Sequence, residues 1–264
     1  MLDLTVAIVS HGHRDYLERC LPTVFAQADE PGAPSFDVHL VVNQNADGAY
    51  EWARNAWPKV VTTMNSRRLG FSANNNLIYR RSRSRYILLL NPDTEVRPGA
   101  FREMWEFMER TPECGIAGPK LLYPDGRLQL SCRRFPTLRS WLLRRTPLRT
   151  LRPDDGSVGD YTMGDWDHEK VREVDWMFGA ALFVRRAAAE RVGLLDEDIF
   201  LFCEDIDWCY RFHKHGWKIF YVPTSVVVHD LHDAEYDRYW SIHGLRHYRS
   251  MMQVAMKHGF GFAK

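Results

Sequence analysis

The chain has 264 residues, of which 45% are hydrophobic and 26% charged, so it is long enough to bury a sizeable core in one large domain or two small ones. Its 35 lysines and arginines nearly balance its 34 aspartates and glutamates, and the formal net charge of +1 gives no overall field that would favour nucleic acid. No apolar run approaches the roughly 20 residues that span a bilayer, and Met1 to Ser10 lacks the pattern of a signal peptide. We therefore expect a cytoplasmic protein with no nucleic-acid partner.

The five cysteines are odd in number, widely separated and never arranged as C-x-x-C. This pattern argues against a disulfide framework and against a zinc site. We expect buried, reduced thiols at Cys20, Cys114, Cys132, Cys203 and Cys209.

The first part of the chain alternates between strand-like and helix-like segments. Leu4 to Ser10 is rich in aliphatic residues and predicts a strand, which the polar turn His11-Gly12-His13 follows. An amphipathic helix is expected from Arg14 to Ala28. A second strand, Phe36 to Asn43, runs into a polar segment that ends at Gly48. Strand, polar turn and helix in this order are typical of an α/β fold.

The same alternation continues up to residue 90. Ala49 to Asn55 predicts a helix, Val60 to Met64 a third strand, and Ser72 to Arg81 a helix that the chain enters through Leu69-Gly70-Phe71. The next strand is Tyr86 to Leu90. Each strand-to-helix unit delivers its loop to the same edge of a mostly parallel sheet, and ligands bind at that edge in open α/β folds.

The strand before Asn91-Pro92-Asp93 is the most informative of these. Ile87 to Leu90 are four consecutive large aliphatic residues, which indicates a strand buried on both faces. Pro92 cannot donate a hydrogen bond to the sheet, so the chain leaves it there and presents Asn91, Asp93 and Glu95 at the carboxyl edge. The alternative is that Asn-Pro-Asp is an ordinary turn.

Two common nucleotide-binding motifs are absent. The sequence has no G-x-G-x-x-G after the first strand and no P-loop motif, which argues against a dinucleotide enzyme and a P-loop NTPase. Three consecutive amides, Asn74 to Asn76, stand at the predicted start of a helix, where they can cap the helix or bind the oxygens of a ligand.

A basic segment interrupts the second half of the chain. A helix from Gly99 to Thr111, a strand from Gly115 to Tyr123 and a returning segment from Leu128 to Arg134 precede it. Arg133 to Arg152 then contains seven arginines and no acid, interleaved with leucines and a tryptophan. Such a segment is typical of a contact with anionic lipid, and a solvated helix that covers an acceptor groove is the alternative. Asp154 to Lys170 is expected to be a mobile loop.

Three acids follow an aromatic run further along the chain. Val174 to Val184 is expected to be one strand that starts with an exposed aromatic residue, and a short helix follows it. Glu204, Asp205 and Asp207 then stand at the start of another helix, where the helix dipole stabilises negative charge and where a general base would also fit. His229 ends an extended stretch, either as a structural residue or as a metal ligand that meets Asp93.

The order of these motifs along nearly the whole chain resembles one known family. The motifs are Val6 to His11, Gly70 to Asn76, Leu90 to Asp93, Gly118 to Gly126, Val174 to Ala180, Phe202 to Asp207, and Gly216-Trp217 through His229. Together they are similar to the family-two GT-A glycosyltransferases, and specifically to their rhamnosyltransferase-like branch.

The resemblance implies a fold and a reaction. The expected fold is α/β of GT-A type, with a Rossmann-like, mostly parallel sheet flanked by helices. A single domain, 1–264, would join a nucleotide-sugar half, 1–97, to an acceptor-binding and catalytic half, 98–264. The implied reaction is an inverting transfer, with L-rhamnose from dTDP-rhamnose as the best match. The acceptor would be a hydroxyl of a glycan or polyprenyl-linked saccharide in bacterial surface polysaccharide synthesis, and such an acceptor would hold the protein peripherally at the inner face of the membrane.

The resemblance also assigns roles to residues. Asp93 and His229 would hold Mg²⁺ or Mn²⁺, and Asp205, beside Glu204, would be the catalytic base. The donor would contact Ser10, His11, Asn43, Asp47, Gly70, Phe71, Asn75, Asn76, Asn91 and Asp93, and the acceptor would contact Trp176, Gly179, Ala180 and Asp207.

Two departures from the family pattern leave alternatives open. Asn91 stands where the family has the first acid of a D-x-D motif, and Asn43 follows the second strand where the family has an acid that reads the pyrimidine base; the nearest acid is Asp47. One alternative is therefore an inactive homologue that acts as a sugar-binding or assembly subunit. Another is a nucleotidyltransferase, but this would need a glycine-rich basic loop where the chain has His11-Gly12-His13-Arg14.

Overall fold

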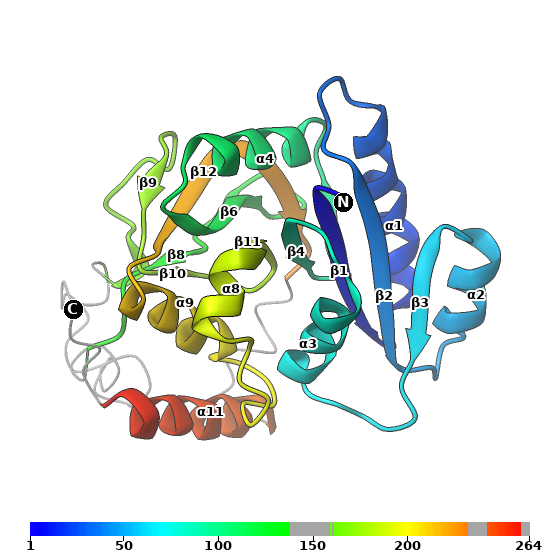
Figure 1. Ribbon diagram of the computed structural model, residues 1–264. Helices are drawn as coiled ribbons and strands as arrows, with labels where there is room; N and C mark the ends of the chain where they lie inside the picture. The colour runs from blue at the N-terminus through cyan, green and yellow to red at the C-terminus, as the bar shows by residue number, and fades with distance from the viewer. Residues whose placement is uncertain (138–158, 160, 232–241, 260–264) are drawn as a thin grey trace.

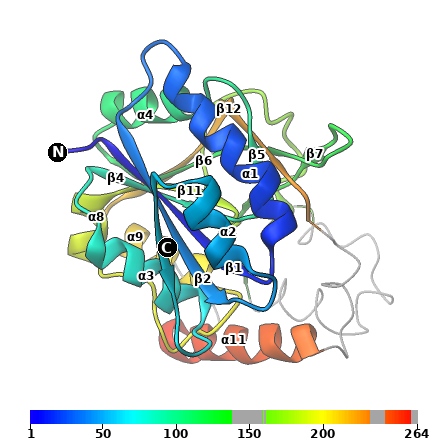
Figure 2. The same ribbon diagram turned by 90° about the vertical axis from the view of Figure 1, so that its right-hand side faces the viewer.

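The computed structural model describes residues 1–137, 159, 161–231 and 242–259. One mixed, mostly parallel sheet forms its centre, and helices cover both faces (Figures 1 and 2). In the first half the elements are β1 (Leu4–His11), α1 (Arg14–Ala26), β2 (Phe36–Gln44), α2 (Ala49–Ala56), β3 (Val60–Met64), α3 (Phe71–Arg81), β4 (Tyr86–Leu90), β5 (Thr94–Val96) and α4 (Ala100–Arg110). In the second half they are β6 (Cys114–Leu122), β7 (Leu128–Gln129), β8 (Cys132–Arg133), β9 (Arg172–Glu173), β10 (Trp176–Met177), β11 (Ala181–Arg185), α8 (Arg186–Val192), α9 (Glu204–Lys214), β12 (Lys218–His229) and α11 (Ile242–His258).

The main sheet has the strand order β3-β2-β1-β4-β11-β6-β12-β5. Neighbours from β3 to β4 are parallel, β11 lies antiparallel between β4 and β6, and β12 is parallel to β6 and antiparallel to β5. This confirms the predicted α/β architecture, including the fully buried strand from Ile87 to Leu90.

Two apolar cores lie on opposite faces of the sheet, because successive side chains of a strand point to opposite sides. Val6 and Ile8 of β1 belong to the core that α1, α2 and α4 cover. Ala7 belongs to the other core, which α3, α8, α9 and α11 cover. The five cysteines are free and buried, as the sequence predicts. Among the described residues, no helix is both long and apolar enough to cross a membrane.

The prediction of one strand from Val174 to Val184 is wrong. The chain forms β10, which pairs with β8 in a small separate sheet, and then turns at Phe178 to Ala180 before β11 joins the main sheet. The aromatic residue at its start is also not exposed, because Trp176 packs beside Tyr161 and its indole N–H donates to the carbonyl of Arg134 at 2.9 Å.

The segment from Tyr161 to Lys170, expected to be a mobile loop, is packed against the core. Tyr161, Met163 and His168 are buried, and Trp166 makes an edge-on ring contact with Tyr221 of β12. Buried aromatic contacts of this kind fix a segment that polar composition alone marks as a loop.

Candidate active site

The two predicted metal ligands lie together at the carboxyl edge of the sheet. Antiparallel pairing of β12 with β5 sets His229 opposite Thr94, the residue after Asp93. Asp93 Oδ1 is 3.5 Å from His229 Nε2. Both atoms are buried and have no hydrogen-bond partner among the residues that the structure describes, whereas buried polar atoms are normally satisfied. This pair of unpaired atoms is therefore a candidate ligand site.

The histidine ring is oriented by a side chain behind it. Gln129 Oε1 is 2.7 Å from His229 Nδ1, and an amide oxygen can only accept, so Nδ1 carries a proton and the tautomer of the neutral ring is the one with its lone pair on Nε2. One carboxylate and one imidazole fit Mg²⁺ or Mn²⁺, whose remaining ligands are commonly substrate phosphates and water. The described residues contain no group of three His, Cys, Asp or Glu side chains that could hold a metal by themselves.

Glu204 and Asp205 begin α9 after an unusual turn. Phe202 and Cys203 both have left-handed backbone angles, with φ of 68° and 66°, which are uncommon for residues other than glycine. Such strain persists only where the surroundings fix it, and it concentrates at functional sites. Ser250 of α11 holds the turn by donating to the carbonyl of Leu201 at 2.8 Å.

The two carboxyl groups differ in their surroundings. Glu204 is buried and its Oε2 has no hydrogen-bond partner, so burial, together with the charge of Asp205, raises the pKa of Glu204. Asp205 is half-buried and accepts hydrogen bonds from the backbone N–H groups of Gly179 and Ile206. Burial raises the pKa of Asp205 as well, and those hydrogen bonds oppose the rise. Near neutral pH, Glu204 is therefore the protonated member of the pair and Asp205 the one that ionises first.

Backbone contacts connect the two candidate centres. The N–H of Asn91 donates to the carbonyl of Ala180 at 2.8 Å, and the N–H of Gly179 donates to Asp205 Oδ2 at 3.1 Å. The turn at Phe178 to Ala180 thus ties the loop that carries Asp93 to the base candidate. Ala180 is buried and contributes its backbone here.

The end of β1 also carries unpaired polar atoms. Ser10 is fully buried, and within the described part of the chain neither its Oγ nor His11 Nδ1 has a hydrogen-bond partner. Burial, followed by the nearby charges of Arg68, His13 and Arg246, lowers the pKa of His11. Both predicted donor contacts therefore retain hydrogen-bonding capacity for a ligand.

Four other predicted donor contacts have structural partners. Asn43 donates to the carbonyl and accepts from the N–H of Leu69, so its amide fixes the loop before α3. Asp47 accepts from the N–H groups of Arg14 and Ala49 and caps two helices. Asn75 donates to the carbonyl of Phe71, and Asn76 donates to the carbonyl of Leu195 and to Glu197.

Gly70 and Phe71 lie against a segment from the second half of the chain. A Cβ on Gly70 would lie 2.6 Å from the carbonyl oxygen of Phe200, so only glycine permits this approach. The N–H of Phe71 donates to that oxygen at 2.9 Å. The pair therefore contributes a packing contact that positions residues 199–203 beside α3.

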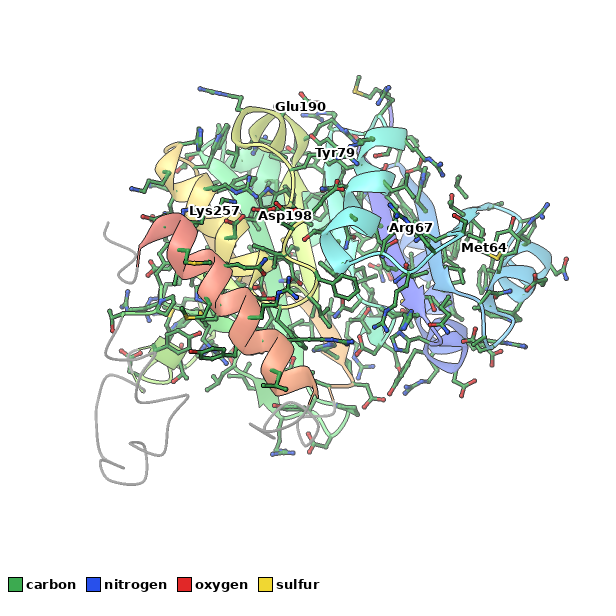
Figure 3. All side chains as sticks on the ribbon, turned by 90° about the horizontal axis from the view of Figure 1, so that it is seen from below. Met64, Arg67, Tyr79, Glu190, Asp198 and Lys257 are labelled. Carbon is green, nitrogen blue, oxygen red and sulfur yellow. The ribbon has the colours of Figure 1, made fainter. Side chains whose placement is uncertain are left out.

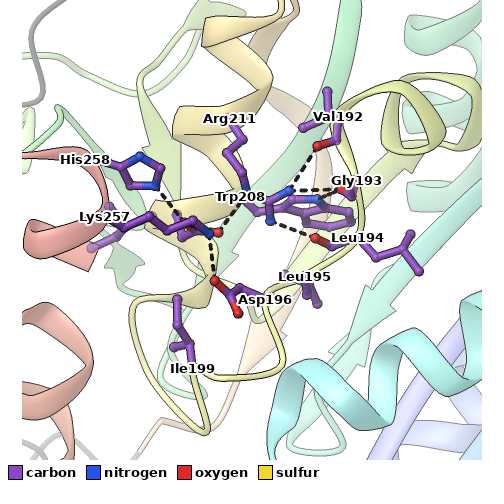
Figure 4. Close-up of polar contacts among 12 residues, drawn as sticks. Val192, Gly193, Leu194, Leu195, Asp196, Ile199, Trp208, Arg211, Lys257 and His258 are labelled. Atoms are coloured by element: carbon purple, nitrogen blue, oxygen red, sulfur yellow. Dashed lines mark hydrogen bonds and ion pairs between the residues drawn. The ribbon is translucent and has the colours of Figure 1, made fainter. Parts of the chain in front are cut away.

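Two predicted acceptor contacts are not accessible. Trp176 is buried as described above. Asp207 is fully buried, and its carboxylate receives Arg211 of α9 at 2.8 Å and Lys257 and His258 of α11 at 2.8 and 2.7 Å. Figure 4 shows Lys257 and His258 reaching from α11 toward α9. These three contacts occupy both oxygens, so we reassign Asp207 from acceptor binding to the attachment of α11.

Most of the predicted lipid-contacting segment, Arg133 to Arg152, lies outside the described residues. Of its seven arginines the structure describes Arg133 and Arg134. Arg133 is buried, donates to the carbonyls of Leu130 and Cys132 and lies over the ring of Phe178. Its guanidinium therefore belongs to the protein interior.

Sequence comparison decides the family. The profile described as "Glycosyltransferase like family 2" matches residues 3–250. The chain belongs to this family. It is accordingly a glycosyltransferase that transfers sugars from nucleotide sugars.

Among curated relatives, this family 2 chain is similar to rhamnosyltransferases. It is 28% identical over 237 residues to the N-acetylglucosaminyl-diphospho-decaprenol L-rhamnosyltransferase of Mycobacterium tuberculosis, with 86% of this chain and 75% of the relative covered. It is 26% identical over 239 residues to the rhamnosyltransferase WbbL of Escherichia coli, with 86% and 83% covered.

A solved structure supports the same fold for this family 2 chain. GalNAc-T7, determined with UDP, GalNAc and Mn²⁺, matches with a TM-score of 0.65 at 16% identity. The match covers 97% of this chain, which spans 48% of the GalNAc-T7 chain. This likeness confirms the GT-A fold that the sequence motifs imply.

The sequence of this family 2 chain did not reveal two features that support the candidate site, Gln129 and the helix α11. Gln129, which orients His229, is a lone amide in a short strand, and nothing in its neighbours marks it. The helix α11 supplies Ser250, Lys257 and His258 to the turn and to α9. Its basic C-terminal residues follow an apolar stretch, so a helix was detectable, but its partners were not.

Proposed function

We propose that the protein is an inverting glycosyltransferase that moves a sugar from a nucleoside diphosphate sugar to a hydroxyl group. L-Rhamnose from dTDP-rhamnose is the proposed donor, and a glycan or polyprenyl-linked saccharide of a bacterial surface polysaccharide is the proposed acceptor. The names of the two relatives support this choice, since both are rhamnosyltransferases and one carries a decaprenol-linked acceptor in its name. With such an acceptor, the reaction would take place in the cytoplasm at the inner face of the membrane.

One observation carries the proposal. Asp93 and His229 face each other with atoms that make no hydrogen bond among the described residues. The loop that carries Asp93 is joined to the Glu204–Asp205 pair by two hydrogen bonds, from Asn91 to Ala180 and from Gly179 to Asp205. The proposed diphosphate site would thereby be held in fixed relation to a carboxylate that can accept a proton. An inverting transfer requires both functions at once.

Asp93 and His229 are the residues that would hold a divalent cation. When bound, Mg²⁺ or Mn²⁺ neutralises the negative charge that builds on the diphosphate as the bond to the sugar breaks. The pairing of His229 with Gln129 presents the basic ring nitrogen toward Asp93 before any ligand arrives. Two protein ligands leave room for diphosphate oxygens, so Asn91 in place of an acid is compatible with metal binding.

Asp205 is the proposed general base. The acceptor hydroxyl must lose its proton as it attacks the anomeric carbon, and a carboxylate accepts that proton. The backbone N–H groups of Gly179 and Ile206 orient the carboxylate. Glu204, protonated in its buried position, avoids a second negative charge beside Asp205 while the latter is ionised.

Release of nucleoside diphosphate from a panel of nucleotide sugars, with and without Mn²⁺, tests this function. We expect metal-dependent release from at least one donor, with dTDP-rhamnose the first choice. An inactive homologue would bind a donor and release nothing. A nucleotidyltransferase would form nucleotide sugar from a sugar phosphate and a nucleoside triphosphate, with release of inorganic diphosphate, and either outcome would replace our proposal.

A further inference from the structure

Two arginines from distant parts of the chain flank one exposed aromatic ring. The guanidinium carbons of Arg68, in the loop before α3, and of Arg246, on α11, are 5.6 and 6.0 Å from the ring centroid of Phe200. Phe200 is 40% exposed. Cation–π attraction explains why either guanidinium would lie near the ring, but it does not explain why two like charges gather there.

These charges lack a counterion within the described residues. Neither Arg68 nor Arg246 forms a hydrogen bond or an ion pair with any residue that the structure describes. His11 is close enough to both that their charges help to lower its pKa, after the effect of its own burial. Two elements, the loop before α3 and α11, thus bring two positive charges to the neighbourhood of His11. Like charges repel each other, so this arrangement is suited to an anionic ligand.

The location of the cluster connects it with the candidate site. Phe200 is fixed at the start of α3 by its bond to Phe71, and it precedes the Glu204–Asp205 turn by a few residues. His11, whose buried Nδ1 has no hydrogen-bond partner among the described residues, ends β1 opposite Gln44 of β2. In Figure 1, α11 lies along the bottom of the molecule, the side toward which β1 to β3 run, and Figure 3 looks onto that side.

The helix that carries Arg246 is firmly attached there. His247 packs against the ring of Phe202 with centroids 5.5 Å apart, and Ser250 bonds the carbonyl of Leu201. Lys257 bridges Asp207 of α9 and Asp196 at 2.8 and 2.7 Å. These contacts hold α11 against the turn through His247 and Ser250 and against α9 through Lys257, so the position of Arg246 is built into the fold.

We propose that Arg68 and Arg246 form a subsite for the phosphate groups of a diphosphate ester, with His11 as a hydrogen-bonding partner. This inference rests on the proposed function and extends it, because it makes α11 part of the substrate site. The diphosphate belongs either to the nucleotide of the donor or to a lipid-linked acceptor. Guanidinium groups suit both sources, since their planar N–H groups bind phosphate oxygens.

The test compares Arg68→Gln and Arg246→Gln with Arg249→Gln, an exposed arginine on the same helix. Calorimetry in Mn²⁺ measures the affinity for dTDP, dTMP, thymidine and farnesyl diphosphate. We expect each of the first two changes to weaken binding of one diphosphate by about tenfold or more. Binding of thymidine should not change, and Arg249→Gln should behave as wild type. Arg246→Lys should restore part of the affinity, because it restores the charge without the planar fork.

The experiment distinguishes a donor diphosphate from an acceptor diphosphate, and it distinguishes failure of the subsite from failure of the proposed function. A loss confined to dTDP assigns the subsite to the donor, and a loss confined to farnesyl diphosphate assigns it to the acceptor. If all three Gln variants bind both diphosphates as wild type does, the subsite is wrong, while metal-dependent sugar release by the same proteins would leave the proposed function intact. If wild type binds neither diphosphate and releases no sugar, both proposals fail.

Discussion

Glu204 and Asp205 are adjacent carboxyl groups with different surroundings, and the difference assigns their chemistry. Glu204 has a buried oxygen without a partner, and Asp205 has two backbone N–H donors. Environments that separate the pKa values of two neighbouring acids are a general way to obtain one neutral and one ionised group. The sequence marks the acids but cannot show this difference, because it depends on burial and on a hydrogen bond from Gly179, which is distant in sequence.

Replacing Asp205 by Asn tests its role as the base. The amide keeps the shape of the side chain but cannot accept a proton, so we expect turnover to fall by roughly 10²-fold or more while donor affinity stays near wild type. Single-turnover rates and calorimetric donor affinity measure the two effects separately. Equal losses in rate and affinity would make Asp205 a binding residue instead.

The pH dependence of kcat/KM follows from the raised pKa of Asp205. A base works in its ionised form, so activity falls as pH decreases through that pKa. Because burial raises it, the acidic limb of the profile should lie clearly above the ordinary value for Asp of about 3.9. The profile is measured between about pH 4 and 9, with a stability control at each pH. A profile with no loss of activity on its acidic side down to about pH 4 would contradict this placement.

Glu204→Gln should change stability in a pH-dependent way. The pKa of Glu204 is raised in the folded state, so its contribution to stability is present below the unfolded-state pKa and is lost as pH rises through the folded-state pKa. Gln does not titrate and avoids that loss. The melting temperature of the variant relative to wild type should therefore increase from pH 5 to pH 8. A difference that is constant with pH would show that Glu204 is not buried as an acid.

At the scale of elements, α11 and α9 are joined through Asp207. Burial alone would raise the pKa of Asp207, but Arg211, Lys257 and His258 hold it below its usual range. Lys257 lies beside a cavity of about 330 Å³ between α11 and the 196–199 loop, with Asp198 on its rim (Figure 3). None of the catalytic candidates lines the cavity, so we regard the contact between α11 and α9 as structural.

Asp207→Ala should destabilise the protein by about 3–5 kcal/mol, because it leaves the largely buried Arg211 and His258 without their partner. Chemical denaturation monitored by tryptophan fluorescence measures this. The contribution of Asp207 is present above the unfolded-state pKa of an Asp and is lost as pH falls, so the two proteins should converge in acid. Asp198→Ala, an exposed acid in the neighbouring loop, is the control. Equal stability of both variants at neutral pH would show that the contacts of Asp207 with Lys257 and His258 do not hold α11.

At the scale of the whole molecule, the sequence predicts the sheet well and the contacts between its halves poorly. The strand from Tyr86 to Leu90 was predictable because its uninterrupted apolar run has one explanation, burial on both faces. Trp176 was misplaced because β10 leaves the main sheet to pair with β8, a contact that no local pattern encodes. Asp207 was misassigned for the same reason, since its partners on α11 are distant in sequence.

The proximity of Asp93 and His229 also depends on contacts between distant parts of the chain. The family resemblance suggested it, but only the pairing of β12 with β5 brings the two side chains to one edge. We propose that this pair, joined to Asp205 through the turn at Phe178 to Ala180, forms a metal-dependent transfer site.

The most direct test is the rate of nucleoside diphosphate release from the preferred donor as Mn²⁺ is titrated, in wild type and in Asp93→Ala. Asp125→Ala, in the exposed turn before β7, is the control. We predict saturable metal-dependent release by wild type and the control, and loss of that release in Asp93→Ala, because the change removes a ligand without disturbing the core strand before it. An Asp93→Ala protein that keeps the wild-type metal response would contradict the account.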